Sequence, residues 1–100
     1  MNTIHQPKFD LGQILATPGA LEALRESGQT PGFFISRHVQ GDWGETGEED
    51  KQLNDQSLID GSRLLSAYKT LKGRRLWIIT EAEDDERCRS ATTVLLPEEY

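Results

Sequence analysis

The spacing of apolar residues changes along this chain after about residue 60. Before that point, apolar or aromatic residues recur three or four positions apart, as in Leu21 with Leu24 and Phe34 with His38, which is the spacing of one helix face. After it, residues 76–81 alternate with the period of two that is typical of strands. The pattern predicts helices in the first part of the chain and a sheet in the second.

Capping signals mark where the first two helices should begin. Residues 17–19 and residues 30–32 both read Thr-Pro-Gly. A threonine can cap free backbone N–H groups, and proline at the first helical position loses no hydrogen bond. We therefore expect helices over residues 18–27, with Gly28 as the stop, and over residues 31–39.

A third helix and a loop are expected before residue 61. Residues 41–45 place two glycines around Trp43, which predicts a tight loop that turns the indole inward. Thr46 and Glu49 have the spacing of a capping box. Acidic residues follow in the first turn of the predicted helix, where the helix dipole stabilises negative charge. Because its apolar content is thin, this helix should lie on the surface and end near Gly61.

The last forty residues predict a meander. Three segments rich in aliphatic, aromatic and β-branched residues are residues 63–69, 74–82 and 90–96. The first of them could equally continue the third helix, and residues 9–15 are a candidate fourth strand or extended edge. We expect an α+β fold in which about three N-terminal helices pack on a three-stranded or four-stranded antiparallel sheet formed by the C-terminal half.

Length and composition place this fold in a single domain of the cytoplasm. One hundred residues, 35% of them hydrophobic, suffice for one core. The lone Cys88 cannot form an internal disulfide, as is usual in a reducing compartment. Residues 1–6 lack the order of a signal peptide, and no apolar run approaches the roughly 20 residues needed to cross a bilayer.

Charge is arranged in blocks, although the net value is −6. Residues 42–60 hold seven acids and one lysine, residues 61–79 hold five bases and no acid, and residues 81–86 are acidic again. The fold must interleave these blocks or present faces of opposite sign.

The acidic blocks supply the candidate partner-binding residues. Carboxylates spaced along a surface can imitate the phosphates of a nucleic acid and occupy a basic groove of another protein. The alternative is an ordinary solvated face. The candidate residues are Glu48, Glu49, Asp50, Glu83, Asp84 and Asp85.

The basic block admits a second binding hypothesis. With Tyr68 and Trp77 nearby, it could hold a nucleic-acid backbone and stack bases. We favour the simpler interpretation, in which these charges keep a sheet edge soluble, because the rest of the chain repels phosphate. The residues are Arg63, Lys69, Lys72, Arg74 and Arg75.

Catalysis without a metal is the remaining chemical possibility. Arg37 and His38, if joined by Arg89 and Thr93, could cleave RNA with histidine as the base and arginine on the phosphate. A histidine near a helix end more often caps carbonyls or packs beside an aromatic ring. His5, His38 and Cys88 lack the paired spacing of a zinc site, and no glycine pattern resembles a phosphate loop, so no metal or cofactor is expected.

Several strings of the sequence carry a resemblance that covers nearly the whole chain. They are LGQ at residues 11–13, ATPGALEAL at 16–24, RH at 37–38, GDWG at 41–44, LWIITEA at 76–82 and RSATTVLLPEEY at 89–100. Together they resemble a family of small uncharacterised bacterial proteins found on plasmids and other mobile elements. The resemblance implies such a setting and brings no catalytic residues, and residues 83–88 depart from it as an acidic lengthening of one loop.

Two functions of different class follow. The preferred one is a small acidic interaction protein of a mobile element, an anti-defence inhibitor of the anti-CRISPR or anti-restriction type, that binds the basic surface of a host or defence protein. The alternative is a metal-independent ribonuclease of the barnase or RelE toxin type. Pairing of the chain with a second copy is left open, and no membrane partner is expected.

Overall fold

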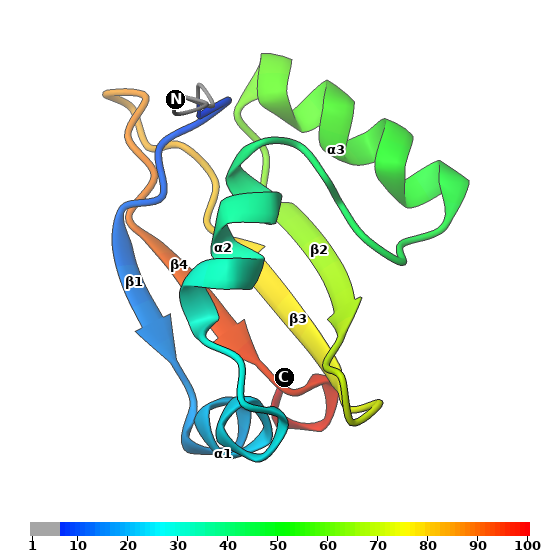
Figure 1. Cartoon of the computed structure of the whole chain (residues 1–100). Coiled ribbons are helices and arrows are strands. Elements are labelled where there is room, and N and C mark those ends of the chain that lie inside the picture. Colours follow the sequence, from blue (N-terminus) through cyan, green and yellow to red (C-terminus); the bar gives the residue numbers. More distant parts are fainter. Residues whose placement is uncertain (1–6) are drawn as a thin grey trace, which may run out of the picture.

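The structure is a computed structural model that describes residues 7–100. It consists of a four-stranded sheet and three helices, and in Figure 1 one helix lies in front of the sheet, one at its lower end and one beside an edge strand. The α+β class is confirmed. No helix in the described part is long and apolar enough to span a membrane. The expectations about residues 1–6, including His5, lie outside the described residues.

The helices and strands fall close to their expected positions. In chain order they are β1 (Gln13–Ala16), α1 (Pro18–Ser27), α2 (Pro31–Val39), α3 (Glu48–Asp60), β2 (Leu64–Lys69), β3 (Arg75–Thr80), β4 (Ala91–Leu95) and the 3-10 turn η1 (Pro97–Glu99). The ambiguous segment near residue 63 is a strand, because Gly61 adopts a left-handed conformation with φ of 82° and ends α3.

The expected order of helices followed by sheet is wrong. Strand β1 precedes the helices and pairs in parallel with β4, with Ile14 opposite Thr92, so the sheet is mixed and its order is β1-β4-β3-β2. Parallel neighbours need a long crossover connection, and the three helices, β2 and β3 all lie between these strands in sequence. The four residues of β1 are too few for their sequence pattern to predict that this strand pairs with β4.

The capping predictions are confirmed for one helix out of three. Thr17 caps α1 by accepting a hydrogen bond from the Ala20 amide at 3.1 Å. Thr30 precedes α2 but makes no capping bond with its side chain. The predicted capping box at α3 is wrong, because Gly47 rather than Thr46 is the N-cap residue.

The core lies between the sheet and helices α1 and α2. Leu24, Phe34, Tyr68 and Ile78 are among its largest buried members and come from both the helices and the sheet. Trp43 is turned inward as expected and is 4% exposed. Helix α3 contributes no aliphatic residue to this fully buried set, and it lies at the β2 edge of the sheet.

The opposite face of the sheet carries no helix among the described residues (Figure 1). Leu76 and Ile78 of β3 point into the core. Side chains alternate along a strand, so Trp77 and Ile79 belong to the other face. We call this face, with its cross-strand neighbours, the open face.

Candidate functional site

His38 lies in the core rather than in a cleft. It is 0% exposed, and both ring nitrogens have hydroxyl partners: Nδ1 is 2.5 Å from Ser66 Oγ and Nε2 is 2.8 Å from Thr80 Oγ1. Burial, and secondarily the charge of Arg89, lowers the pKa of His38 to about 3. The imidazole is therefore neutral at physiological pH.

A chain of hydroxyl groups fixes which nitrogen of His38 carries the proton. Thr92 donates to the Leu11 carbonyl at 2.7 Å and is 2.7 Å from Thr80. Each hydroxyl has one proton, so Thr80 must donate to Thr92 and accept from Nε2–H of His38. Nδ1 then accepts from Ser66. Every polar atom of this chain is used to join α2 to three strands.

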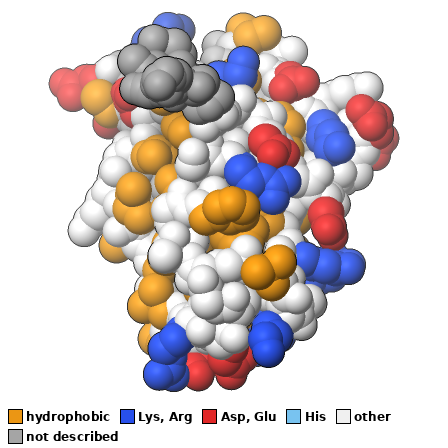
Figure 2. All heavy atoms as spheres, in the orientation of Figure 1, with side chains coloured by type: hydrophobic (Ala, Val, Ile, Leu, Met, Phe, Trp, Pro, Cys, Tyr) orange, Lys and Arg blue, Asp and Glu red, His pale blue; other side chains and the backbone are white. Residues whose placement is uncertain are grey.

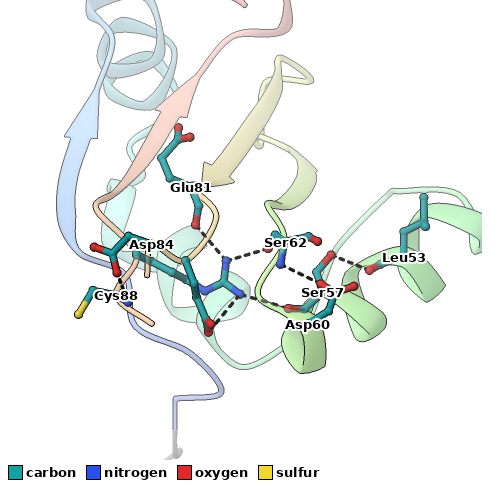
Figure 3. A network of polar contacts seen from close by, with 9 residues as sticks. Leu53, Ser57, Asp60, Ser62, Glu81, Asp84 and Cys88 are labelled. Carbon is teal, nitrogen blue, oxygen red and sulfur yellow. Dashed lines mark hydrogen bonds and ion pairs between the residues drawn. The ribbon is translucent and has the colours of Figure 1, made fainter. Parts of the chain in front are cut away.

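The polar groups of Arg89 are also bonded within the protein. Figure 3 labels Ser57, Ser62 and Glu81, whose carbonyl oxygens accept these bonds. The Arg89 guanidinium donates to the carbonyl oxygens of Ser62 at 2.8 Å, Glu81 at 3.0 Å and Ser57 at 3.2 Å, and its side chain is 2% exposed. The Ser57 carbonyl belongs to the last turn of α3, where a cation is favoured by the helix dipole. Arg89 thus attaches the end of α3 to the sheet.

The four residues of the ribonuclease hypothesis do not form one site. Arg37 is on the surface, where its Nε lies 2.7 Å from Asp42. This pairing raises the pKa of Arg37, and it lowers the pKa of Asp42. Thr93 follows Thr92 in β4 and so faces away from His38. No shared surface lets these groups reach one phosphate.

The acidic candidates lie in two groups. Glu48, Glu49 and Asp50 form the exposed first turn of α3, whereas Glu83 follows β3 and donates its amide to the Gly61 carbonyl beyond the other end of α3. A helix of 13 residues is about 20 Å long. In Figure 2, acidic side chains accordingly appear in separate places, over α3 and over the β3–β4 loop.

The acidic loop is internally organised. Asp84 accepts hydrogen bonds from the amides of Glu86 at 2.8 Å and Cys88 at 2.9 Å. Glu83 lies 3.9 Å from the buried Arg89. Among residues 7–100, neither Asp84 nor Asp85 makes an ion pair, and Asp85 lacks the side-chain hydrogen bonds that hold Asp84.

Helix α3 has no apolar inner face, and two of its aliphatic residues point to solvent. Leu53 and Ile59 are 64% and 75% exposed, whereas Asn54 and Ser57 are 5% and 6% exposed. A helix of a monomeric domain normally turns its aliphatic residues to the core. The residues that follow one outer line of α3, which we call the outer ridge, are Glu49, Leu53, Gln56 and Asp60.

Asn54 explains why the buried side of α3 is polar. Its side-chain amide donates to the Leu65 carbonyl at 2.7 Å and accepts from the Leu65 amide at 3.1 Å. These two bonds occupy the edge of β2 as a neighbouring strand would. Farther along, Trp43 and Glu45 bond to Ala67 of the same edge. Sequence reasoning missed Asn54, and a buried asparagine has no local signature.

Replacement of Asn54 by alanine is expected to lower the free energy of unfolding by about 2 kcal/mol, because two backbone groups of Leu65 lose their partners. Urea denaturation followed by tryptophan fluorescence measures the change. Gln56→Ala is the control on the exposed side of the same helix and should stay within about 0.5 kcal/mol of the wild type. Equal effects of the two changes would contradict this role for Asn54.

The basic block is divided by the fold. Lys72 and Arg74 lie at the β2–β3 turn, and Arg74 pairs with Glu98 at 3.7 Å. Tyr68, the aromatic residue that the sequence placed beside these bases, is 2% exposed and cannot stack with a ligand. Burial raises the pKa of Tyr68 to about 12, and its hydroxyl donates to the Asp42 carbonyl.

Comparisons of the chain with protein-family models, curated proteins and solved structures found no match.

Proposed function

We propose that this protein is an interaction protein, an anti-defence inhibitor of a mobile genetic element that acts in the cytoplasm and binds the basic surface of a nucleic-acid-binding protein. The outer ridge of α3 is its main contact surface. The proposal is supported chiefly by Leu53, an aliphatic residue of the outer ridge that is 64% exposed, and by the carboxylates that flank it along the ridge. Exposed aliphatic residues rimmed by polar ones are typical of protein-binding surfaces.

The charges of α3 define the kind of partner. Glu49 and Asp60 stand near the two ends of the outer ridge, with Leu53 between them. Carboxylates at the two ends of the ridge attract a basic surface, and they raise the rate of encounter. The aliphatic side chains supply contacts that resist salt. A partner surface that is basic and partly apolar satisfies both features.

A matched pair of charge reversals tests the proposal. We expect Glu49→Lys to weaken binding at least tenfold, because it places a base opposite a basic partner, whereas Glu26→Lys should change it less than twofold. Both glutamates are exposed helical residues without an ion pair among residues 7–100, and both changes alter the net charge equally. Glu26 is on α1, away from the outer ridge.

The partner is first captured from a bacterial lysate on the immobilised chain. That protein is purified, and its dissociation constant is determined by calorimetry for wild type, both glutamate variants and Leu53→Ser. The Leu53 variant should also bind at least tenfold more weakly, and added salt should weaken the wild-type complex. A retained protein with an acidic surface, or equal binding by Glu49→Lys and Glu26→Lys, would refute the proposal.

The ribonuclease alternative has no comparable support. His38 and Arg89 are both buried, and their polar atoms are used within the protein. A general base must reach the proton that it removes from a substrate.

A further inference from the structure

The open face of the sheet combines aromatic and basic residues. Cross-strand pairing places Lys69 beside Arg75 and Trp77 beside Leu95. Ile79 lies between Leu65 and Thr93, and is buried there among its neighbours. The face is therefore apolar in its centre, and Lys69 and Arg75 lie at one end of it.

The C-terminal residue extends this surface. Tyr100 is 68% exposed and packs edge-to-face on Trp77, with ring centroids 5.7 Å apart. Its hydroxyl accepts a hydrogen bond from Arg63 at 2.7 Å. Two aromatic rings and a guanidinium thus form one cluster on the side of the sheet away from α1 and α2.

Charge on the open face is opposite to that of the whole chain. The bases that strand alternation assigns to it are Arg63, Lys69 and Arg75, and all three are exposed. Among residues 7–100, the same alternation assigns one acid to the open face, Glu81, which follows the last residue of β3. The face is net positive in a chain of charge −6.

We propose that the open face binds single-stranded nucleic acid, RNA or DNA, with bases stacked on Trp77 and Tyr100 and phosphates held by Arg63, Lys69 and Arg75. Aromatic residues on an open sheet stack unpaired bases, and neighbouring cations neutralise the backbone. Four strands span about 14 Å between the outermost two, which gives room for two or three bases. The site is separate from the outer ridge of α3 and independent of the proposed function.

A second copy of the chain is a poorer occupant of this face. Two-fold pairing of the face with itself would bring two sets of three bases into one interface, and like charges there cost free energy. A nucleic-acid duplex is also disfavoured, because its bases are already stacked and its backbone would approach the acidic remainder of the protein.

Fluorescence anisotropy with the full chain tests the proposal. The probes are fluorescein-labelled single strands of about 12 nucleotides, as DNA and as RNA, and the duplex of the same sequence. Both single strands should bind more tightly than the duplex. With three phosphate contacts, the logarithm of the binding constant should fall against the logarithm of salt concentration with a slope of about −2. Tryptophan emission should be quenched on binding, since Trp43 is buried and Trp77 is the accessible indole.

Surface variants locate the site without disturbing the core. Tyr100→Ala should weaken single-strand binding roughly tenfold through lost stacking. Arg75→Gln should weaken it and make the salt slope shallower by about 0.7. Arg25→Gln is the matched control, since Arg25 is exposed on α1 and the change in charge is the same. Circular dichroism verifies that each variant is folded.

Three results would overturn the proposal. The first is duplex binding as tight as single-strand binding, or no binding of either at low salt. The second is equal weakening by Arg75→Gln and Arg25→Gln, which would indicate general electrostatic attraction. The third is a dimer in sedimentation that Tyr100→Ala dissociates, which would assign the open face to a second copy.

Discussion

Replacement of Arg89 by alanine is expected to lower the free energy of unfolding by about 4 kcal/mol, the cost of breaking a buried charged network from one side. The guanidinium bonds to three carbonyl oxygens, of Ser57, Ser62 and Glu81. Without it, these acceptors stay buried with fewer partners. The end of α3 also loses its attachment to the strand that follows the acidic loop.

Thermal unfolding monitored by circular dichroism measures this loss, which for a chain of this size corresponds to a fall in Tm of roughly 20 °C. Arg89→Lys should recover only part of it, because one ammonium cannot reproduce the planar guanidinium fork. Glu83→Gln is the control: its carboxylate is 3.9 Å away and 26% exposed, so its effect should be within about 1 kcal/mol. A melting temperature for Arg89→Ala close to that of Glu83→Gln would contradict the assignment.

Acidification from pH 7 to pH 5 is expected to destabilise the protein by about 2 kcal/mol through His38 alone. The pKa of His38 is lowered to about 3 in the folded protein, chiefly by burial, against 6.5 as the ordinary value. Between these values the unfolded chain binds a proton that the folded chain does not. Stability is therefore complete above pH 6.5 and is lost as the pH falls toward 3, by up to about 1.4 kcal/mol per unit.

Urea denaturation at several values between pH 7 and pH 5 tests this linkage, in a range above the ordinary pKa values of carboxylates. His38→Asn should be less stable at pH 7 and should lose most of the pH dependence. As a check that needs no variant, the His38 ring proton in the NMR spectrum should not titrate between pH 7 and pH 4. A wild-type stability that is flat over this range, or a titrating His38 signal, would refute the prediction.

Two of the residues that the sequence suggested as catalytic, His38 and Arg89, thus stabilise the fold. His38 and Arg89 both replace solvent with backbone or hydroxyl partners. Both lie beside Phe9, whose ring centroid is 5.1 Å from the His38 ring and 5.8 Å from the Arg89 guanidinium carbon. Sequence alone could not distinguish a catalytic pair from a structural one, because the difference is which groups surround each side chain.

Local patterns determined the parts of this protein that depend on near neighbours in sequence. The Thr-Pro-Gly signals located α1 and α2, and glycine ended α3. Residue type located β3 and β4 to within one or two residues, whereas the segment of β2 was left open between strand and helix. These features depend on backbone sterics and on apolar spacing within about ten residues. The acidic and basic blocks were also evident, because charge is a property of the chain itself.

Only the tertiary structure decided how distant segments combine. Strand β1 pairs with β4, although nearly the whole chain separates them in sequence. The Asn54 side chain bonds to the backbone of the β2 edge. The tertiary structure also turned Leu53 outward, and it joined Tyr100 to Trp77. Each of these contacts depends on which surfaces remain unpaired once the helices and strands have packed, and that competition has no signature in any local window of sequence.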